Sequence, residues 1–139
     1  MAASQDEPTI SDAEWRVLSA LWRLDDTAAT AQAVAAEVRP AQGWAIATVK
    51  TLLGRLVEKE AVEASADPSD RRRFLYQAKL SPTQARRRAA KSFVDRIFAG
   101  DTAAGALHLV EQADLSKDQI DQLRDALASA ERRAKGSSS

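Results

Sequence analysis

Apolar residues recur with helical spacing along the first part of the chain. Between Ile10 and Leu24 they occupy positions 15, 18, 21 and 22, which form one stripe of a helix. Ser11 and Glu14 have the spacing of a capping box, so the helix is predicted to begin there. We expect the polar run Asp25-Asp26-Thr27 to end it.

Two further helices are predicted, separated by a turn at Gln42-Gly43. The second helix is predicted over Ala31–Val38, with Thr30 as its N-cap and Pro40 after its end. The third extends from about Ala45 to Lys59. Its buried stripe has the spacing i, i+3, i+4, i+7 and i+8 and consists of Val49, Leu52, Leu53, Leu56 and Val57.

After the third helix the pattern changes to alternation. Strands are predicted over Val62–Ala66 and Arg73–Ala78, and in the second strand Phe74 and Tyr76 point to the same side. Between the strands, Asp67-Pro68-Ser69-Asp70 has the composition of a turn. The two runs therefore predict a β-hairpin.

The rest of the chain returns to helical patterns. Ser81-Pro82 is expected to start a fourth helix that ends near Phe98. A short fifth helix is predicted over Thr102–Gln112. The capping box Ser116-x-x-Gln119 then starts a last helix, which is expected to extend to about Arg133.

This order of elements predicts a mostly α fold with a small β-hairpin. We assign residues 10–79 to a winged helix-turn-helix DNA-binding domain and residues 80–133 to a C-terminal helical dimerisation arm. Residues 1–9 and 134–139 are expected to be flexible tails, because they have little apolar surface to bury.

The third helix carries small, hydroxyl and basic residues opposite its apolar stripe. Thr48, Lys50 and Thr51 are candidates for contacts with base edges in the major groove, and Arg55 for a phosphate contact. Gly54 would let the helix lie close to the DNA backbone. The same pattern also fits a solvated helix face in a helical bundle.

The hairpin adds basic residues to this picture. Arg71, Arg72 and Arg73 alternate sides on a β-ribbon, so at least one of them points away from the core. Their guanidinium groups suit a wing that binds phosphates beside the groove. The alternative is a charged strand edge that prevents aggregation. A basic hairpin directly after an amphipathic helix favours the winged helix.

Composition narrows the chemistry. The 139 residues include no cysteine and one histidine, His108, so disulfides and zinc–thiolate sites are excluded. We expect no catalytic residues, no metal and no cofactor. With no long apolar run and no secretory signal, a cytoplasmic protein is expected.

The net charge is zero, which by itself does not favour a nucleic-acid partner. The charges are unevenly distributed, however. The segment 81–100 and the hairpin are basic, whereas the acidic surplus lies in residues 101–133. A neutral total is therefore compatible with a basic DNA-binding face.

Several stretches together resemble a known family. They are Ile10-Ser11-Asp12-Ala13-Glu14-Trp15 with Leu18, Leu21 and Trp22, then Ala47–Lys59, Arg73-Phe74-Leu75-Tyr76, Ser92–Gly100, Leu109-Val110-Glu111 and Leu115–Leu123. In this order, over about residues 10–130, they resemble the penicillinase-repressor (BlaI/MecI/CopY-type) family of winged-helix transcriptional repressors.

The resemblance implies a bacterial homodimer that binds a pseudo-palindromic promoter operator with TACA/TGTA-like half-sites. It implies control of β-lactamase or other antibiotic-resistance genes. Carried onto this chain, it makes Ala47, Thr48, Lys50 and Thr51 base-facing and Arg55 a backbone contact. With the second helix and the hairpin included, the predicted DNA-binding residues are Thr30, Ala47, Thr48, Lys50, Thr51, Arg55, Arg71 and Arg72.

The arm holds more apolar residues than short, isolated helices can bury. The candidate dimerisation residues are Phe93, Val94, Ile97, Phe98, Leu107, Val110, Leu115, Ile120, Leu123 and Leu127. Either they pack back on the winged helix or they interlock with a second chain. A dimer is favoured, because an uncovered arm would expose a large apolar patch.

Inducible members of the family are released when a membrane-bound sensor-protease system signals and the C-terminal arm is cleaved. The matching bond here is His108–Leu109.

The chain departs from the family pattern at three places. Trp44-Ala45-Ile46 replaces Trp-Ser-Pro at the start of the recognition helix, Glu60 replaces a glycine after it, and the cysteines of the copper-responsive branch are missing. The first change removes a side-chain N-cap worth about 1 kcal/mol. The last excludes copper sensing through those cysteines.

Two other functions stay open at this stage. Winged helices also serve as protein–protein adaptor modules without DNA binding, which the neutral net charge favours. The other alternative is a DNA-binding regulator that a small ligand, and not proteolysis, releases from DNA. In that case Trp15, Trp22 and Trp44 would line the ligand pocket. An enzyme is disfavoured, because no phosphate-binding loop, metal cluster or nucleophile–base pair is present.

Overall fold

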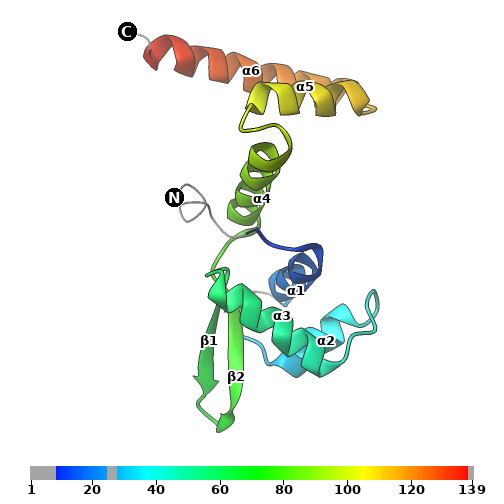
Figure 1. Ribbon diagram of the computed structural model, residues 1–139, viewed down its shortest axis with the longest axis vertical. Helices are drawn as coiled ribbons and strands as arrows, with labels where there is room; N and C mark the ends of the chain where they lie inside the picture. Colours follow the sequence, from blue (N-terminus) through cyan, green and yellow to red (C-terminus); the bar gives the residue numbers. More distant parts are fainter. Residues whose placement is uncertain (1–8, 25–27, 138–139) are drawn as a thin grey trace.

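The computed structural model describes residues 9–24 and 28–137. Its elements are α1 (Asp12–Arg23), α2 (Ala31–Val38), α3 (Ile46–Glu58), β1 (Val62–Asp67), β2 (Asp70–Ala78), α4 (Pro82–Ile97), α5 (Thr102–Gln112) and α6 (Lys117–Ser137). Figure 1 shows an elongated molecule: α1 to α3 and the hairpin form one end, α4 leads away from them, and α5 and α6 lie across the far end. The predicted fold class, mostly helical with one hairpin, is confirmed.

Local sequence signals explain where the helices begin. Ser11 and Ser81 each form a complete capping box, with Glu14 and Gln84 respectively, and Thr30 accepts a hydrogen bond from the amide of Ala33. The predicted end of the first helix at residues 25–27 lies outside the described residues; α1 itself ends at Arg23. The starts of these three helices were thus predictable from pairs of residues three positions apart in the sequence.

Helix α3 begins and ends differently. At its start, Ala45 offers no side-chain hydrogen bond, in agreement with the missing N-cap. At its end, the amide of Glu60 donates to the Val57 carbonyl and the amide of Ala61 to the Leu56 carbonyl. This is a Schellman closure, and it holds Glu60 at a φ of 60°, a conformation that favours glycine.

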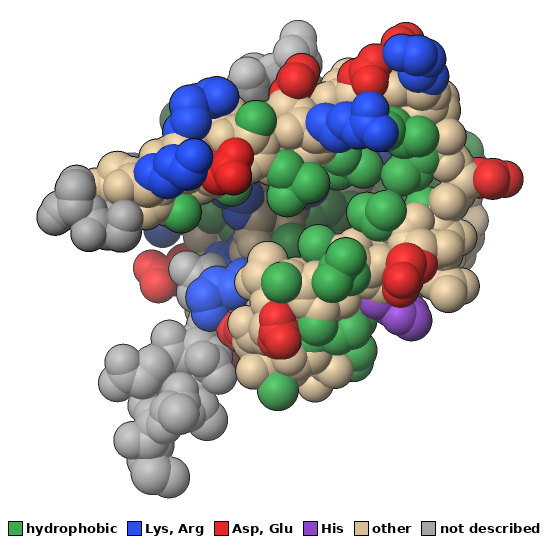
Figure 2. Space-filling model, turned by 90° about the horizontal axis from the view of Figure 1, so that it is seen from above, with side chains coloured by type: hydrophobic (Ala, Val, Ile, Leu, Met, Phe, Trp, Pro, Cys, Tyr) green, Lys and Arg blue, Asp and Glu red, His purple; other side chains and the backbone are tan. Residues whose placement is uncertain are grey.

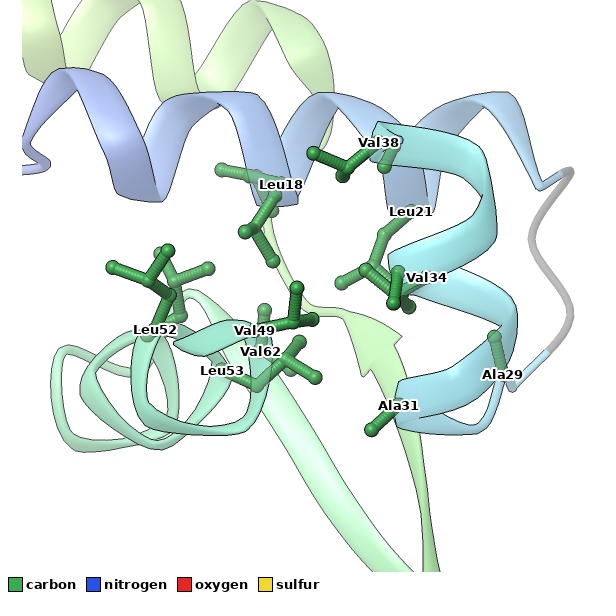
Figure 3. Packing of buried hydrophobic residues seen from close by; sticks show 14 of the residues in the cluster. Leu18, Leu21, Ala29, Ala31, Val34, Val38, Val49, Leu52, Leu53 and Val62 are labelled. Carbon is green, nitrogen blue, oxygen red and sulfur yellow. The ribbon is translucent and has the colours of Figure 1, made fainter. Parts of the chain in front are cut away.

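The core lies between α1, α2, α3 and the start of β1. Figure 3 shows Leu18 and Leu21 of α1 facing Val34 of α2 and Val49 of α3 across it. These residues and Leu53, Leu56 and Val62 are almost completely buried. Burying such side chains stabilises the fold by about 1.5–3 kcal/mol each, so α3 is held rigidly by its inner face.

The hairpin is longer than the sequence predicts. β1 and β2 pair antiparallel, with Ala66 opposite Phe74 and Asp67 opposite Asp70. We expected β2 to begin at Arg73, but it begins at Asp70, so Arg71 and Arg72 also belong to the strand. The reason is that Asp67 binds the amide and hydroxyl of Ser69, which reduces the turn to two residues.

A short β-bridge joins the hairpin to the segment before α2. The amide of Ala29 donates to the carbonyl of Tyr76 over 2.9 Å, and the amide of Tyr76 donates back over 2.7 Å. Tyr76 and Leu80 also pack against the core. The position of the hairpin relative to α2 and α3 is therefore fixed by backbone hydrogen bonds.

The arm makes few contacts with the rest of its own chain. Gly105 of α5 packs against Phe98 and Val94 of α4, where an added Cβ would lie 3.2 Å from the Phe98 ring. The predicted capping box at Ser116 and Gln119 is formed. α6 extends to Ser137, four residues beyond its predicted end at Arg133, so residues 134–137 are helical.

Within the described residues, no helix combines the length and the apolar character needed to cross a lipid bilayer.

Candidate nucleic-acid interface

The exposed face of α3 is the one that the sequence predicts. Ala47, Thr48, Lys50, Thr51 and Arg55 are all exposed, as is Gly54. The opposite face, with its leucines and Val49, is buried. An α-helix held in this way presents small and basic side chains to solvent, which is the surface that a major groove accommodates.

Thr51 uses its hydroxyl proton within the helix. The Thr51 Oγ1 donates to the carbonyl of Ala47 over 3.1 Å. The methyl group and the oxygen lone pairs of Thr51 are what it offers to a ligand. A methyl group at this place suits an apolar contact with the methyl group of thymine.

A concavity of about 370 Å³ lies between the N-terminus of α2, the outer face of α3 and β2. We call it the basic concavity, and its lining includes Thr30, Gln32, Lys50, Arg72, Arg73 and Phe74. It brings together three predicted DNA-binding residues, Thr30, Lys50 and Arg72, from three different elements. Arg71 does not line it, although it is exposed nearby on β2.

The electrostatics of the basic concavity favour an anion. Lys50, Arg72 and Arg73 contribute three positive charges, and the N-terminus of α2 adds the positive end of a helix dipole. Among the described residues, no ion pair involves Lys50, Arg55 or Arg72. These cations are thus available to an anionic ligand.

Two residues of the basic concavity, Gln32 and Phe74, were not proposed from the sequence as contacts, and Arg73 was named as a wing arginine but not among the predicted DNA-binding residues. Gln32 and Arg73 are exposed, and Phe74 is 54% exposed despite its large ring. Gln32 lies in the first turn of α2, where no periodic pattern marks it. Phe74 directly follows Arg71, Arg72 and Arg73, and an aromatic residue next to three arginines was the sequence signal that could have identified it.

The tip of the hairpin carries acidic groups. The Asp70 carboxylate accepts a hydrogen bond from the amide of Arg72. The Ser69 hydroxyl and amide, together with the charge of Arg73, hold the pKa of Asp67 below its ordinary value. The charge at the tip is therefore mixed, and the basic surface lies further along β2.

In the concavities lined by described residues, the three tryptophans do not occur together. The rings of Trp15 and Trp22 pack edge to face at 5.6 Å, and the indole nitrogen of Trp22 donates to the Leu80 carbonyl over 2.9 Å. Trp15 lines a shallow depression beside the turn between α2 and α3, but Trp22 and Trp44 do not. Trp22 instead ties α1 to the segment before α4.

The arm exposes the predicted dimerisation residues on a single chain. Leu127 is 70% exposed, Leu107 64% and Ile97 59%, and Phe93, Val110, Ile120 and Leu123 are also exposed. Val94, Phe98 and Leu115 are half-buried. Figure 2 shows apolar side chains gathered along the facing edges of α5 and α6, around a hollow between the two helices. These exposed apolar side chains therefore do not pack back on the winged helix.

His108 and Leu109 lie within α5, and both are exposed. The His108 ring lies 5.8 Å from the ring of Phe98. In the part of the chain that the structure describes, no three His, Cys, Asp or Glu side chains gather into a group that could hold a metal ion.

Known proteins show matching sequences over nearly the whole chain. The penicillinase repressor family matches residues 10–129. The methicillin resistance regulatory protein MecI of Mammaliicoccus sciuri is 29% identical over 118 residues, which cover 85% of this chain and 92% of that protein. The penicillinase repressor of Staphylococcus aureus is 26% identical over 127 residues, covering 91% and 95% respectively.

Solved structures give a weaker likeness. A mutant of Staphylococcus aureus MepR bound to an oligodeoxyribonucleotide aligns with a TM-score of 0.47 and 19% identity, over 89% of this chain and 79% of that one.

Proposed function

We propose, from the premise that this chain belongs to the penicillinase repressor family, that it binds operator DNA as a homodimer and thereby represses transcription. The family is one of transcriptional regulators, and its two relatives described above are a regulatory protein of methicillin resistance and a penicillinase repressor. The operator would be pseudo-palindromic, with TACA/TGTA-like half-sites. The genes under control would be those of a β-lactamase or of another antibiotic resistance.

One observation carries this proposal. The basic concavity joins Lys50 of α3, Arg72 of β2 and the N-terminus of α2, next to the exposed face of α3. In the proposed complex, Ala47, Thr48, Lys50 and Thr51 face the bases. Arg55, Arg71, Arg72 and Thr30 contact phosphates, which position the helix but carry no sequence information.

Repression would follow from steric occlusion of the promoter. Two α3 helices related by a two-fold axis enter successive major grooves, about one helical turn of DNA apart. The exposed apolar side chains of the arm support the dimer, because a second chain that covers them removes this apolar surface from water.

Release from DNA would follow from cleavage in the arm at His108–Leu109, with a membrane sensor-protease system as the signalling partner. The bond lies on an exposed helix, so it is reachable once α5 unfolds locally.

The test is fluorescence anisotropy on a labelled duplex with TACA and TGTA half-sites, against scrambled DNA, at several salt concentrations. We expect selective binding that weakens steeply as salt rises. Arg55→Ala should weaken binding to both duplexes alike and reduce the salt slope by about one, whereas Lys50→Ala should reduce selectivity. Arg16→Ala, which removes an exposed cation on α1, is the matched control and should change neither.

Equal, weak binding of the unmodified chain to both duplexes would refute the proposal and favour an adaptor without DNA binding. A loss at Arg55→Ala that is confined to the operator would refute its role as a phosphate contact. Unchanged operator affinity of Lys50→Ala would remove that residue from the contact surface.

A further inference from the structure

A cluster of polar contacts joins the end of the recognition helix to the start of the arm. We call it the junction, and it consists of Thr9, Glu14, Lys59, Arg88 and Ser92. These residues come from the segment before α1, from α1, from the C-terminal end of α3 and from α4. None of them belongs to the DNA-binding surface proposed above.

Lys59 is the centre of the junction. It is the C-cap of α3, and its Nζ donates to the Glu14 carboxylate and, over 2.6 Å, to the carbonyl of Thr9. Glu14 is 2% exposed, and it also accepts a hydrogen bond from the amide of Ser11. The end of α3 is thus bound to the start of α1 by a buried ion pair.

Arg88 extends these contacts to the arm. Its Nη2 donates to the backbone carbonyl of Lys59 over 2.9 Å. A guanidinium group at this place meets the negative end of the α3 dipole and one of its free carbonyls. On the same face of α4, the Ser92 hydroxyl lies 2.9 Å from the hydroxyl of Thr9.

Apolar packing alone leaves the direction of α4 poorly fixed. Ala85 is the buried residue of α4, and it lies one turn before Arg88. Two hydrogen bonds hold the chain before α4. The indole nitrogen of Trp22 donates to the carbonyl of Leu80, and the amide of Lys79 donates to the carbonyl of Ala61. A helix held at its first turn is free to swing; the contacts of Arg88 and Ser92 supply the second point that fixes its direction.

We propose that Arg88 and Lys59 are positioning residues that set the angle between α3 and the arm, and with it the half-site spacing that the dimer accepts. This inference depends on the function proposed above. The lever is long, because the 16 residues of α4 span about 24 Å. A swing of roughly 10° at the junction moves its far end by about 4 Å, which exceeds the rise of one base pair, about 3.4 Å.

The experiment measures operator affinity on duplexes whose half-sites are moved apart or together by one and two base pairs. The variant is Arg88→Met, which keeps the length of the side chain and removes its donors. Arg87→Met, the exposed neighbour on α4, is the matched control. Dimer dissociation is measured in parallel by sedimentation.

We expect the unmodified chain and Arg87→Met to bind one spacing best and to lose affinity at each step away from it. The operator affinity of Arg88→Met should be about tenfold lower at the best spacing, which is the equivalent of one hydrogen bond to a charged group. At the other spacings its affinity should be reduced less, so that its affinity depends less on half-site spacing than that of the unmodified chain. Its dimer dissociation constant should be unchanged.

An Arg88→Met profile with the same shape as that of the unmodified chain, whether or not it is lowered uniformly, would overturn the inference. Ser92→Ala is the second variant if Arg88→Met does not fold, and a flattening in the same direction is again required. If the unmodified chain itself binds operator and scrambled DNA equally, the proposed function fails, and this inference fails with it.

Discussion

The closure after α3 leads to a sharp prediction about stability. Glu60 has a φ of 60°, and its amide and that of Ala61 complete the hydrogen bonds at the end of the recognition helix. A side chain with a Cβ pays about 1–2 kcal/mol for a left-handed conformation, whereas glycine adopts it freely. Glu60→Gly should therefore stabilise the fold.

The expected magnitude is smaller than this strain. Glycine makes the unfolded chain more flexible, which costs about 0.4–1 kcal/mol. The ion pair of Glu60 with Lys79 spans 3.9 Å, and with the Glu60 side chain 82% exposed its loss costs only a few tenths of a kcal/mol. The net gain is about 0.5 kcal/mol, or about 2 °C in Tm for a chain of this size.

The assay is thermal unfolding followed by circular dichroism, with urea unfolding as a second measure of the free energy. Glu60→Ala is the matched control: it removes the carboxylate but keeps the Cβ, so Tm should stay the same or fall slightly. Glu58→Gly, on the exposed last turn of α3, should lower the unfolding free energy by up to about 1 kcal/mol.

If Glu60→Gly were no more stable than Glu60→Ala, the left-handed conformation of residue 60 would not be a source of strain, and the reasoning from its φ of 60° would be wrong.

The two remaining predictions concern the buried ion pair and the arm. Burial raises the pKa of Glu14, but Lys59 and the Ser11 amide outweigh it, so the pKa lies below its ordinary value of 4.5. The stabilisation is therefore complete above pH 4.5 and is lost as the pH falls through the folded-state pKa. Glu14→Gln should lower the free energy of unfolding by about 2 kcal/mol at pH 7, as expected for a hydrogen bond to a charged group. Its free energy of unfolding, measured with urea, should also fall less steeply at acid pH, and an unchanged pH dependence would contradict this. Phe93→Asp combined with Leu123→Asp should produce monomers in light scattering and weaken operator binding, and dimers of unchanged strength would contradict the proposed interface.

Features set by neighbouring residues were predictable from the sequence. The capping boxes at Ser11, Ser81 and Ser116 each depend on two side chains three positions apart, so local chemistry decides where those helices begin. The outer face of α3 was predictable for the same reason, because its buried stripe determines which residues are left exposed. Lys50 and Arg55 were identified in this way.

Features set by long-range contacts were not predictable. The bridge between Ala29 and Tyr76 and the ion pair between Glu14 and Lys59 join residues that no periodic pattern relates. The basic concavity depends on that bridge, because it places β2 beside the N-terminus of α2. Gln32 was therefore not predicted as a contact residue, whereas Lys50, which lines the same concavity, was.

The few packing contacts that α5 makes within its own chain have a consequence for the lifetime of the protein. An 11-residue helix is too short to be stable alone in water, and α5 is held mainly by Gly105 against α4. If a second chain supplies the missing contacts, α5 is ordered only above the concentration at which chains pair. Scarce molecules would then expose His108–Leu109 as extended backbone and be degraded fastest, so that a falling repressor level would hasten its own decline.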